Sequence, residues 1–147
     1  PLIHIPTVDA LAYNLAGNRD IICPLMDARR NQTYTGLYRF DGNQMEIIKP
    51  QCAVGIDEII AEVNKLGQAV VFLGDGVAVF EAYIRENCTV PYTFAPAHVN
   101  KQRAGAVAAL GEIYYTEGKT ETAEEHKPDY LRLSQAERER LEGEQKK

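Results

Sequence analysis

The sequence predicts an α/β domain in which a mixed β-sheet carries helices on its faces. Two observations predict this fold. Strand patterns follow one another without an intervening helix over residues 20–50, which favours an antiparallel meander. After them, the apolar run Ala69–Leu73 lies between two helix patterns, which is typical of βα crossover units. A chain of 147 residues with 45% hydrophobic residues suffices for one domain with its own core.

The N-terminal residues predict a short helix. Val8, Leu11 and Leu15 recur on one helical face. Thr7 is expected to be the N-cap of this helix, and Gly17 the residue at which the chain leaves it.

Three strands are expected next. Residues 20–26 form an apolar strand, and Pro24 within it predicts an edge position or a bulge because proline has no N–H to donate. Residues 32–40 alternate and are rich in aromatic and β-branched side chains, as a strand should be. Asp41-Gly42 is a hairpin signal, and the return strand is expected to end before Pro50.

Helices and strands alternate in the second half of the chain. A helix is expected over Asp57–Gly67, then a central strand at Ala69–Leu73, and a second helix directly after Gly74-Asp75-Gly76. A short strand at Val90–Phe94 and a tightly packed, Ala-rich helix over Gln102–Tyr115 complete the order. This order is that of the RNase-H-like halves of the actin-like ATPase superfold.

These elements divide the chain into three parts. We expect residues 1–19 to be an inter-domain helix, residues 20–118 the RNase-H-like domain, and residues 119–147 an extended segment followed by a charged tail. In the tail, Ser134 with Glu137 has the spacing of a capping box.

Composition restricts the classes of function. The net charge of −5 disfavours unaided binding to a phosphate backbone, which depends on Lys and Arg. The three cysteines and three histidines show no metal-ligand spacing, so we expect free thiols in a reducing compartment and no metal. No apolar run is long enough to span a bilayer, and we expect a cytoplasmic location.

The first candidate site follows the first strand. Asp27 stands beside Arg29 and Arg30, and guanidinium groups present a planar donor fork that suits a phosphate or a partner's carboxylate. The alternative is a solvated turn in which Asp27 accepts local backbone hydrogen bonds. Both interpretations stay open at this stage.

The second candidate site is the turn Gly74-Asp75-Gly76, between a buried strand and a helix. Glycines permit close approach of a nucleotide, and a helix N-terminus favours an anion, but Asp75 would repel a phosphate. The alternative is a tight turn capped by Asp75. Asp27 and Asp75 are expected at the same end of the sheet. Without a nucleophile and supporting base in the sequence, a scaffold is favoured over an enzyme.

A weaker candidate is a basic spot before the last helix, formed by His98, Lys101 and Arg103. Charges at a helix entrance are usually solvated, and this is the interpretation we favour.

Three stretches taken together resemble the TsaB (YeaZ) family. They are residues 26–34 (MDARRNQTY), residues 73–76 (LGDG) and residues 127–132 (KPDYLR). The family shows a DARR turn followed by a tyrosine, a GDG turn after an apolar strand, and a P-x-YLR segment near the C-terminus. The helix pattern around residues 8–12 also resembles the inter-domain helix of the family.

The resemblance implies a non-catalytic accessory protein of the actin-like ATPase superfold. Such proteins pair with the catalytic paralogue TsaD and the ATPase TsaE, form homodimers, and take part in transferring a threonylcarbamoyl group to adenosine 37 of tRNA. It implies no cofactor of the chain's own, with ATP or ADP expected only at the interface with the partner subunit, and tRNA contacted only through the complex. An HxxxH metal pair of the TsaD type is absent from the sequence.

One departure from the family is large. The N-terminal half of the family, with its Asp-Thr-Ser strand and its GPGSFTGxR stretch, has no counterpart here. We therefore expect a C-terminal fragment that self-associates through a face that is normally covered. Two other classes stay open: a nucleotide-binding module or small enzyme that uses Asp27, Asp75 and the GDG turn, and an interaction module that docks through the Ala-rich helix at Ala104–Leu110.

Overall fold

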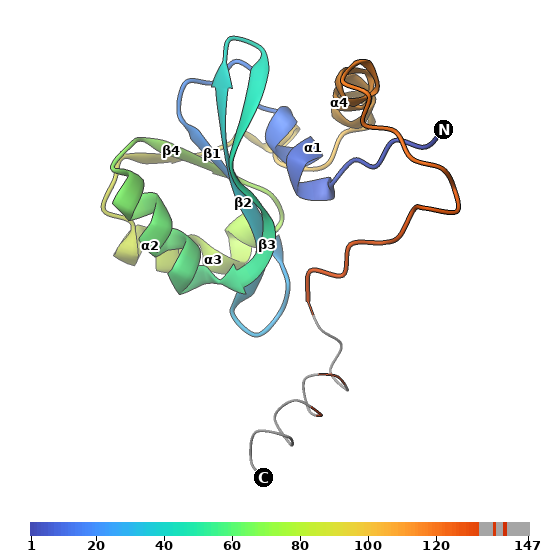
Figure 1. The fold of residues 1–147 in the computed structure, drawn as a ribbon. Helices are drawn as coiled ribbons and strands as arrows, with labels where there is room; N and C mark the ends of the chain where they lie inside the picture. The colour runs from blue at the N-terminus through green and yellow to red at the C-terminus, as the bar shows by residue number, and fades with distance from the viewer. Residues whose placement is uncertain (133–136, 138–139, 141–147) are drawn as a thin grey trace.

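The computed structural model describes residues 1–132, 137 and 140, so the expected Ser134 cap lies outside the described residues (Figure 1). The helices are α1 (Thr7–Tyr13), α2 (Ile56–Leu66), α3 (Gly76–Asn87) and α4 (Ala104–Thr116), with the 3-10 turn η1 (Ala97–Val99). The strands are β1 (Ile21–Asp27), β2 (Gln32–Asp41), β3 (Gln44–Gly55), β4 (Val70–Leu73) and β5 (Tyr92–Phe94). This element order is the one that the sequence predicted.

The five strands form one mixed sheet in the order β3-β2-β1-β4-β5. β1 pairs antiparallel with β2 and parallel with β4, and β5 adds a further parallel strand. The edge position expected from Pro24 is wrong, because β1 is central in the sheet. Pro24 has no N–H to donate to β2, but its carbonyl accepts a 2.6 Å hydrogen bond from the hydroxyl of Thr35 on that strand.

The hairpin of β2 and β3 is longer than expected. Asp41 pairs with Gln44, so the two turn residues are Gly42 and Asn43. Pro50 does not end the return strand, which continues to Gly55. β3 is an edge strand, where a missing N–H is least costly, and its pairing with β2 shifts register beside the proline.

Helices cover both faces of the sheet (Figure 1). α2 and α3 pack on one face, over a core that includes Ile21, Leu25 and Phe72. α1 covers the other face, where Ile22 of β1, Tyr38 of β2 and residues of β4 are buried. Because successive side chains of a strand alternate between faces, the apolar run of β1 supplies both cores.

α1 and α4 depart from the details expected. α1 begins at Thr7 with Pro6 at the N-cap position, and it ends at Tyr13, before the left-handed Gly17 (φ 84°). The tight packing expected for α4 is wrong, since among its residues only Leu110 and Tyr114 are buried. α4 rests on α1 rather than on the sheet, which leaves its small residues exposed or half-buried.

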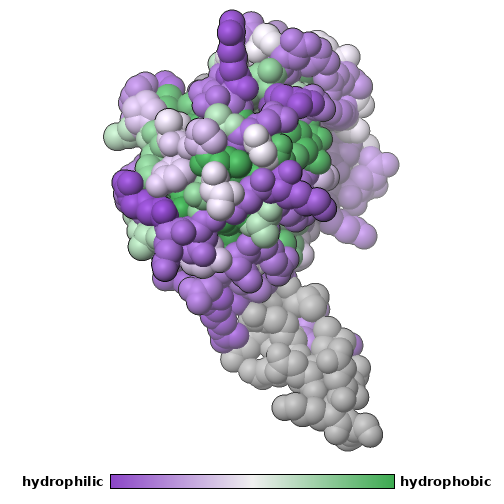
Figure 2. Space-filling model, turned by 90° about the vertical axis from the view of Figure 1, so that its left-hand side faces the viewer, coloured by the Kyte–Doolittle hydropathy of each residue, from purple (hydrophilic) through white to green (hydrophobic). Residues whose placement is uncertain are grey.

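The surface on the side of α2 and α3 is mostly polar, with apolar patches between the charged side chains (Figure 2). Within the described residues, no helix combines the length and the apolar character needed to cross a membrane.

Candidate functional site

The two predicted carboxylates lie together at one end of the sheet. β1 and β4 run parallel, with Pro24 beside Leu73, so both strands end at the same edge. The backbone N–H of Asp27 donates to Oδ1 of Asp75 at 3.3 Å. Oδ1 of Asp27 in turn accepts a 2.8 Å hydrogen bond from the N–H of Arg29. Both carboxylates therefore hold backbone in place at this edge.

The two arginines belong to a turn with unusual backbone. Arg29, Arg30 and Asn31 have φ values of 66°, 53° and 58°, a left-handed conformation that L-residues other than glycine rarely adopt. The side chain of Arg29 is 85% exposed, and its guanidinium lies 3.6 Å from Oδ2 of Asp27. Arg30 is exposed as well. The turn thus presents two cations to solvent beside one carboxylate.

The glycines of the GDG turn allow close packing within the protein. Gly74 has a φ of 111°, and a Cβ at Gly74 or Gly76 would collide with the carbonyl of Leu25 on β1. The N–H of Gly74 donates to Oδ1 of Asn100 at 2.8 Å. Asp75 stands at the N-cap position of α3 but makes no capping hydrogen bond with its side chain, so the expected cap is wrong. Because these glycines have no side chain, β1 packs directly against the turn.

The expected basic spot is exposed. His98 on η1, and Lys101 and Arg103 between η1 and α4, all face solvent. The carbonyl of Lys101 accepts a 2.8 Å hydrogen bond from Nδ2 of Asn14, which fastens this loop to the end of α1.

Sequence reasoning missed a buried carboxylate on α1. Asp9 is only 5% exposed, and it joins three elements. The hydroxyl of Tyr38 on β2 donates to Oδ1 at 2.5 Å, and the hydroxyl of Tyr114 on α4 donates to Oδ2 at 3.0 Å. An acid in the first turn of a helix usually faces solvent. The position of Asp9 next to Val8 on the apolar face of the pattern is the signal that could have revealed it.

Burial shifts the pKa values of Asp9, Tyr38 and Tyr114. Burial raises the pKa of Asp9, and the two tyrosine hydroxyls oppose that rise. The pKa values of Tyr38 and Tyr114 are raised as well, first by burial and then by the neighbouring carboxylate. Both phenols therefore stay protonated and act as hydrogen-bond donors to Asp9.

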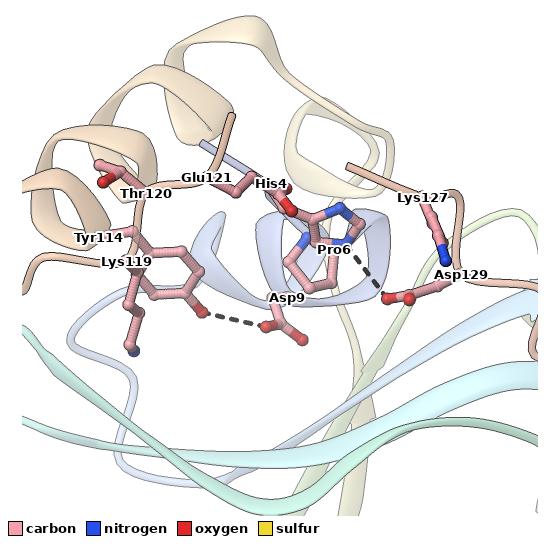
Figure 3. Close-up of a pocket in the computed structure, with 9 residues that line it drawn as sticks. All are labelled: His4, Pro6, Asp9, Tyr114, Lys119, Thr120, Glu121, Lys127 and Asp129. Atoms are coloured by element: carbon pink, nitrogen blue, oxygen red, sulfur yellow. Dashed lines mark hydrogen bonds and ion pairs between the residues drawn. The ribbon is translucent and has the colours of Figure 1, made fainter. Parts of the chain in front are cut away.

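Asp9 lies at the edge of a pocket of about 470 Å³ (Figure 3). The remaining lining residues come from the N-terminal segment and from the chain around and after the end of α4: His4, Pro6, Tyr114, Lys119, Thr120, Glu121, Lys127 and Asp129. Nζ of Lys119 lies 4.2 Å from the centre of the Tyr114 ring. The pocket presents both charges, which suits a small polar ligand or an ion.

Two histidines are brought together beside this pocket, although they lie near opposite ends of the described chain. Nε2 of His4 lies 3.2 Å from Oδ2 of Asp129, and Nδ1 of His126 lies 2.7 Å from Oε1 of Glu121. Each histidine thus faces a carboxylate, rather than the hydroxyl or thiol that a nucleophilic mechanism would use. Their spacing along the chain did not indicate this meeting.

The three cysteines are free thiols, as the sequence predicted. Cys23 is fully buried in β1, and burial raises its pKa to about 12. Cys52 and Cys88 are partly buried, and burial raises their pKa values as well. A thiol needs a lowered pKa to act as a nucleophile at neutral pH.

The family model of TsaD, tRNA N6-adenosine threonylcarbamoyltransferase, matches residues 1–140. The chain belongs to this family. It is 29% identical over 139 residues to the tRNA threonylcarbamoyladenosine biosynthesis protein TsaB of Bacillus subtilis, covering 93% of this chain and 58% of that protein. The chain therefore spans little more than half the length of this relative, and the resemblance to TsaB noted from its motifs is confirmed.

Solved structures agree on the fold of this TsaD-family chain. YeaZ from Pseudomonas aeruginosa superposes with a TM-score of 0.62 at 15% identity, over 86% of this chain and 58% of that one. A second structure, described as similar to peptidase YeaZ from Pseudomonas aeruginosa, gives 0.62 at 16% identity, over 87% and 57%. The predicted RNase-H-like fold is confirmed.

Proposed function

We propose that this chain acts as a non-catalytic, TsaB-like scaffold in the complex that installs the threonylcarbamoyl group on adenosine 37 of tRNA. The observation that carries the proposal is similarity over nearly the whole chain, both to the TsaD family model and to a protein named for threonylcarbamoyladenosine biosynthesis. The fold shared with YeaZ supports it.

The chemistry of the candidate residues supports a scaffold rather than an enzyme. Asp27 and Asp75 are occupied with backbone hydrogen bonds. Gly74 and Gly76 make room for β1. Each of these residues thus has a structural task, and the paired carboxylates place negative charge where a nucleotide phosphate would have to lie.

The partners in this proposal are a TsaD-like catalytic subunit and a TsaE-like ATPase, with homodimerisation in the full-length family. The net charge of −5 fits a chain that meets tRNA only through the complex. ATP or ADP, in the same proposal, binds only at the interface with the partner subunit. The proposal includes a cytoplasmic location for the chain.

A capture experiment tests the proposal. The tagged chain is incubated with purified TsaD and TsaE. A chimera that adds the part of Bacillus subtilis TsaB not matched by this chain is tested beside it. We expect the chimera to retain TsaD and to restore threonylcarbamoyladenosine, measured by mass spectrometry of tRNA nucleosides, in cells depleted of TsaB. A chimera that is folded but fails in both assays would overturn the assignment.

The non-catalytic part of the proposal needs its own variants. Asp27→Asn and Asp75→Asn in the chimera remove the charges at the strand ends and keep the shape of the side chains. We expect the modification level to stay within about twofold of the unsubstituted chimera, which corresponds to a change of about 0.4 kcal/mol or less in the barrier. If either variant captures TsaD normally but abolishes modification, these carboxylates take part in the chemistry.

A further inference from the structure

Two histidines and two carboxylates converge where the N-terminal segment meets the chain after α4. The ring centres of His4 and His126 are 5.4 Å apart. The ligand atoms that His4, Glu121 and His126 offer all lie within 4.8 Å of one another. Oδ2 of Asp129 lies 3.2 Å from Nε2 of His4. Figure 3 shows His4, Glu121 and Asp129 around the same hollow.

One nitrogen of this cluster lacks a hydrogen bond. Nε2 of His4 is buried, and within the described part of the chain it makes no well-directed hydrogen bond, even though the carboxylate of Asp129 is near. A buried polar atom without a partner is costly. Oδ2 of Asp129, the oxygen that approaches His4, also accepts a 2.9 Å hydrogen bond from Nε2 of Gln51 on β3. A hydrogen-bonded carboxylate beside a histidine is typical of metal sites, where it orients the ring of the ligand.

The backbone fixes the cluster in place. Leu2 and Glu121 exchange two hydrogen bonds, of 2.7 and 3.0 Å, which align the N-terminal segment with the chain after α4. The N–H of His126 donates to the carbonyl of Thr122 at 3.1 Å, so the chain turns back and returns His126 to Glu121. The ligand atoms are therefore arranged by local structure rather than by chance contact of long side chains.

We propose that His4, Glu121 and His126 bind a divalent transition-metal ion, with zinc the best match, and that Asp129 lies beside the site and orients the ring of His4. Imidazole and carboxylate groups are accepted zinc ligands. With zinc–ligand distances of about 2.0–2.2 Å, neighbouring ligand atoms of a tetrahedral site lie about 3.3 Å apart. The ligand atoms of His4, Glu121 and His126 lie within 4.8 Å of one another, so the widest separation would close by about 1.5 Å at most, and a water molecule would complete the four ligands. The 2.7 Å between His126 and Glu121 would open by about half an ångström.

Charge supports the same conclusion. The carboxylate of Glu121 in the site and that of Asp129 beside it together balance a doubly charged cation. Lys119, which lines the adjoining pocket, is drawn away by an ion pair with Glu117 at 2.7 Å and by the ring of Tyr114. The ion would tie the N-terminal segment to the chain after α4, independently of the proposed role in tRNA modification.

Metal titration of the whole chain tests this proposal. With any affinity tag removed and the protein freed of metal by a chelator, zinc is titrated by calorimetry, and cobalt is added as a spectroscopic probe. We expect one ion per chain with a dissociation constant tighter than about 10 µM. We also expect the visible absorption of tetrahedral cobalt and a higher melting temperature in zinc, because a ligand that binds only the folded state stabilises it.

Matched variants locate the ion. His126→Ala changes an exposed residue, and His4→Ala and Glu121→Gln remove the other central ligands. Each should weaken zinc binding by at least about tenfold and abolish the zinc-dependent rise in melting temperature. His98→Ala removes the remaining histidine, which is exposed and lies on η1, and should change nothing.

The alternative is that the two histidines only form ion pairs with their carboxylates. In that case zinc would bind weakly or with several ions per chain, and the variants would bind it as the unsubstituted chain does. Either result, in variants that keep the circular dichroism of the folded chain, would overturn the proposal.

Discussion

Removal of one hydroxyl from the buried group around Asp9 should destabilise the whole domain. In Tyr38→Phe the ring keeps its packing, but Oδ1 of Asp9 loses the 2.5 Å hydrogen bond. Tyr38 is fully buried and Asp9 nearly so, so Oδ1 of Asp9 would lose a donor at a position with little access to solvent. The carboxylate would be left with Tyr114 as its remaining side-chain donor among the described residues.

The expected loss is about 1.5–3 kcal/mol of unfolding free energy, the range for a hydrogen bond to a charged group. Tyr114→Phe should cost less, since its bond to Asp9 is longer, at 3.0 Å. Urea unfolding followed by circular dichroism measures both values. A further test combines Tyr38→Phe with Asp9→Asn. The double variant should lose less unfolding free energy than Tyr38→Phe and Asp9→Asn lose in sum, because both substitutions remove the same interaction.

A matched control is available on the same helix. Tyr115 is 57% exposed, and Tyr115→Phe should change stability by less than about 0.5 kcal/mol. The reasoning is refuted if Tyr38→Phe behaves like this control, or if the double variant is strictly additive. Either result would mean that Asp9 does not depend on the hydroxyl of Tyr38.

Three further predictions concern ionisation and packing. Because burial raises the pKa of Asp9 above its ordinary 3.8, the folded chain binds that proton more tightly than the unfolded chain. Wild-type stability should therefore fall relative to Asp9→Asn as pH rises from about 3.8 through the raised pKa, a trend that unfolding at several pH values measures. Gly74→Ala should lower the free energy of unfolding by at least about 2 kcal/mol, because the new Cβ would collide with β1 and the residue has a positive φ. Gly105→Ala is the matched control on α4: its Cβ meets open space, and it should raise the free energy of unfolding by about 0.5–1 kcal/mol. Iodoacetamide at pH 8 should leave Cys23 unmodified in the folded chain, because it is buried with a pKa of about 12, while the other two cysteines react slowly, as peptide mass mapping would show.

The strand order was predictable because local patterns determine it. The meander over residues 20–50 and the apolar run Ala69–Leu73 each carry their own periodicity and turn residues, and the βα connection then places Asp75 beside Asp27. Where a rule concerns a single residue, context can outweigh it. Pro24 predicted an edge, yet β1 is central because its apolar side chains are needed in the cores on both faces.

The group around Asp9 and the histidine cluster could not be predicted from spacing. Asp9 meets Tyr38 and Tyr114, and His4 meets His126, only after the N-terminal segment and the chain from α4 onward have come together. Such contacts depend on how α1 and α4 are placed, and periodicity does not encode that placement. The small residues of α4 suggested close packing, but the helix rests on α1 and leaves most of its surface open.

The hydrogen bonds between Leu2 and Glu121 also bear on the order of folding. They close a loop that contains the sheet and helices α1 to α4, so they can form only after this part of the chain is compact. We therefore expect the amide of Leu2 to exchange with solvent long before those of β1 and β4, through local opening that leaves the sheet intact. The N-terminal segment would then be the last part of the described chain to dock during folding and the first to detach.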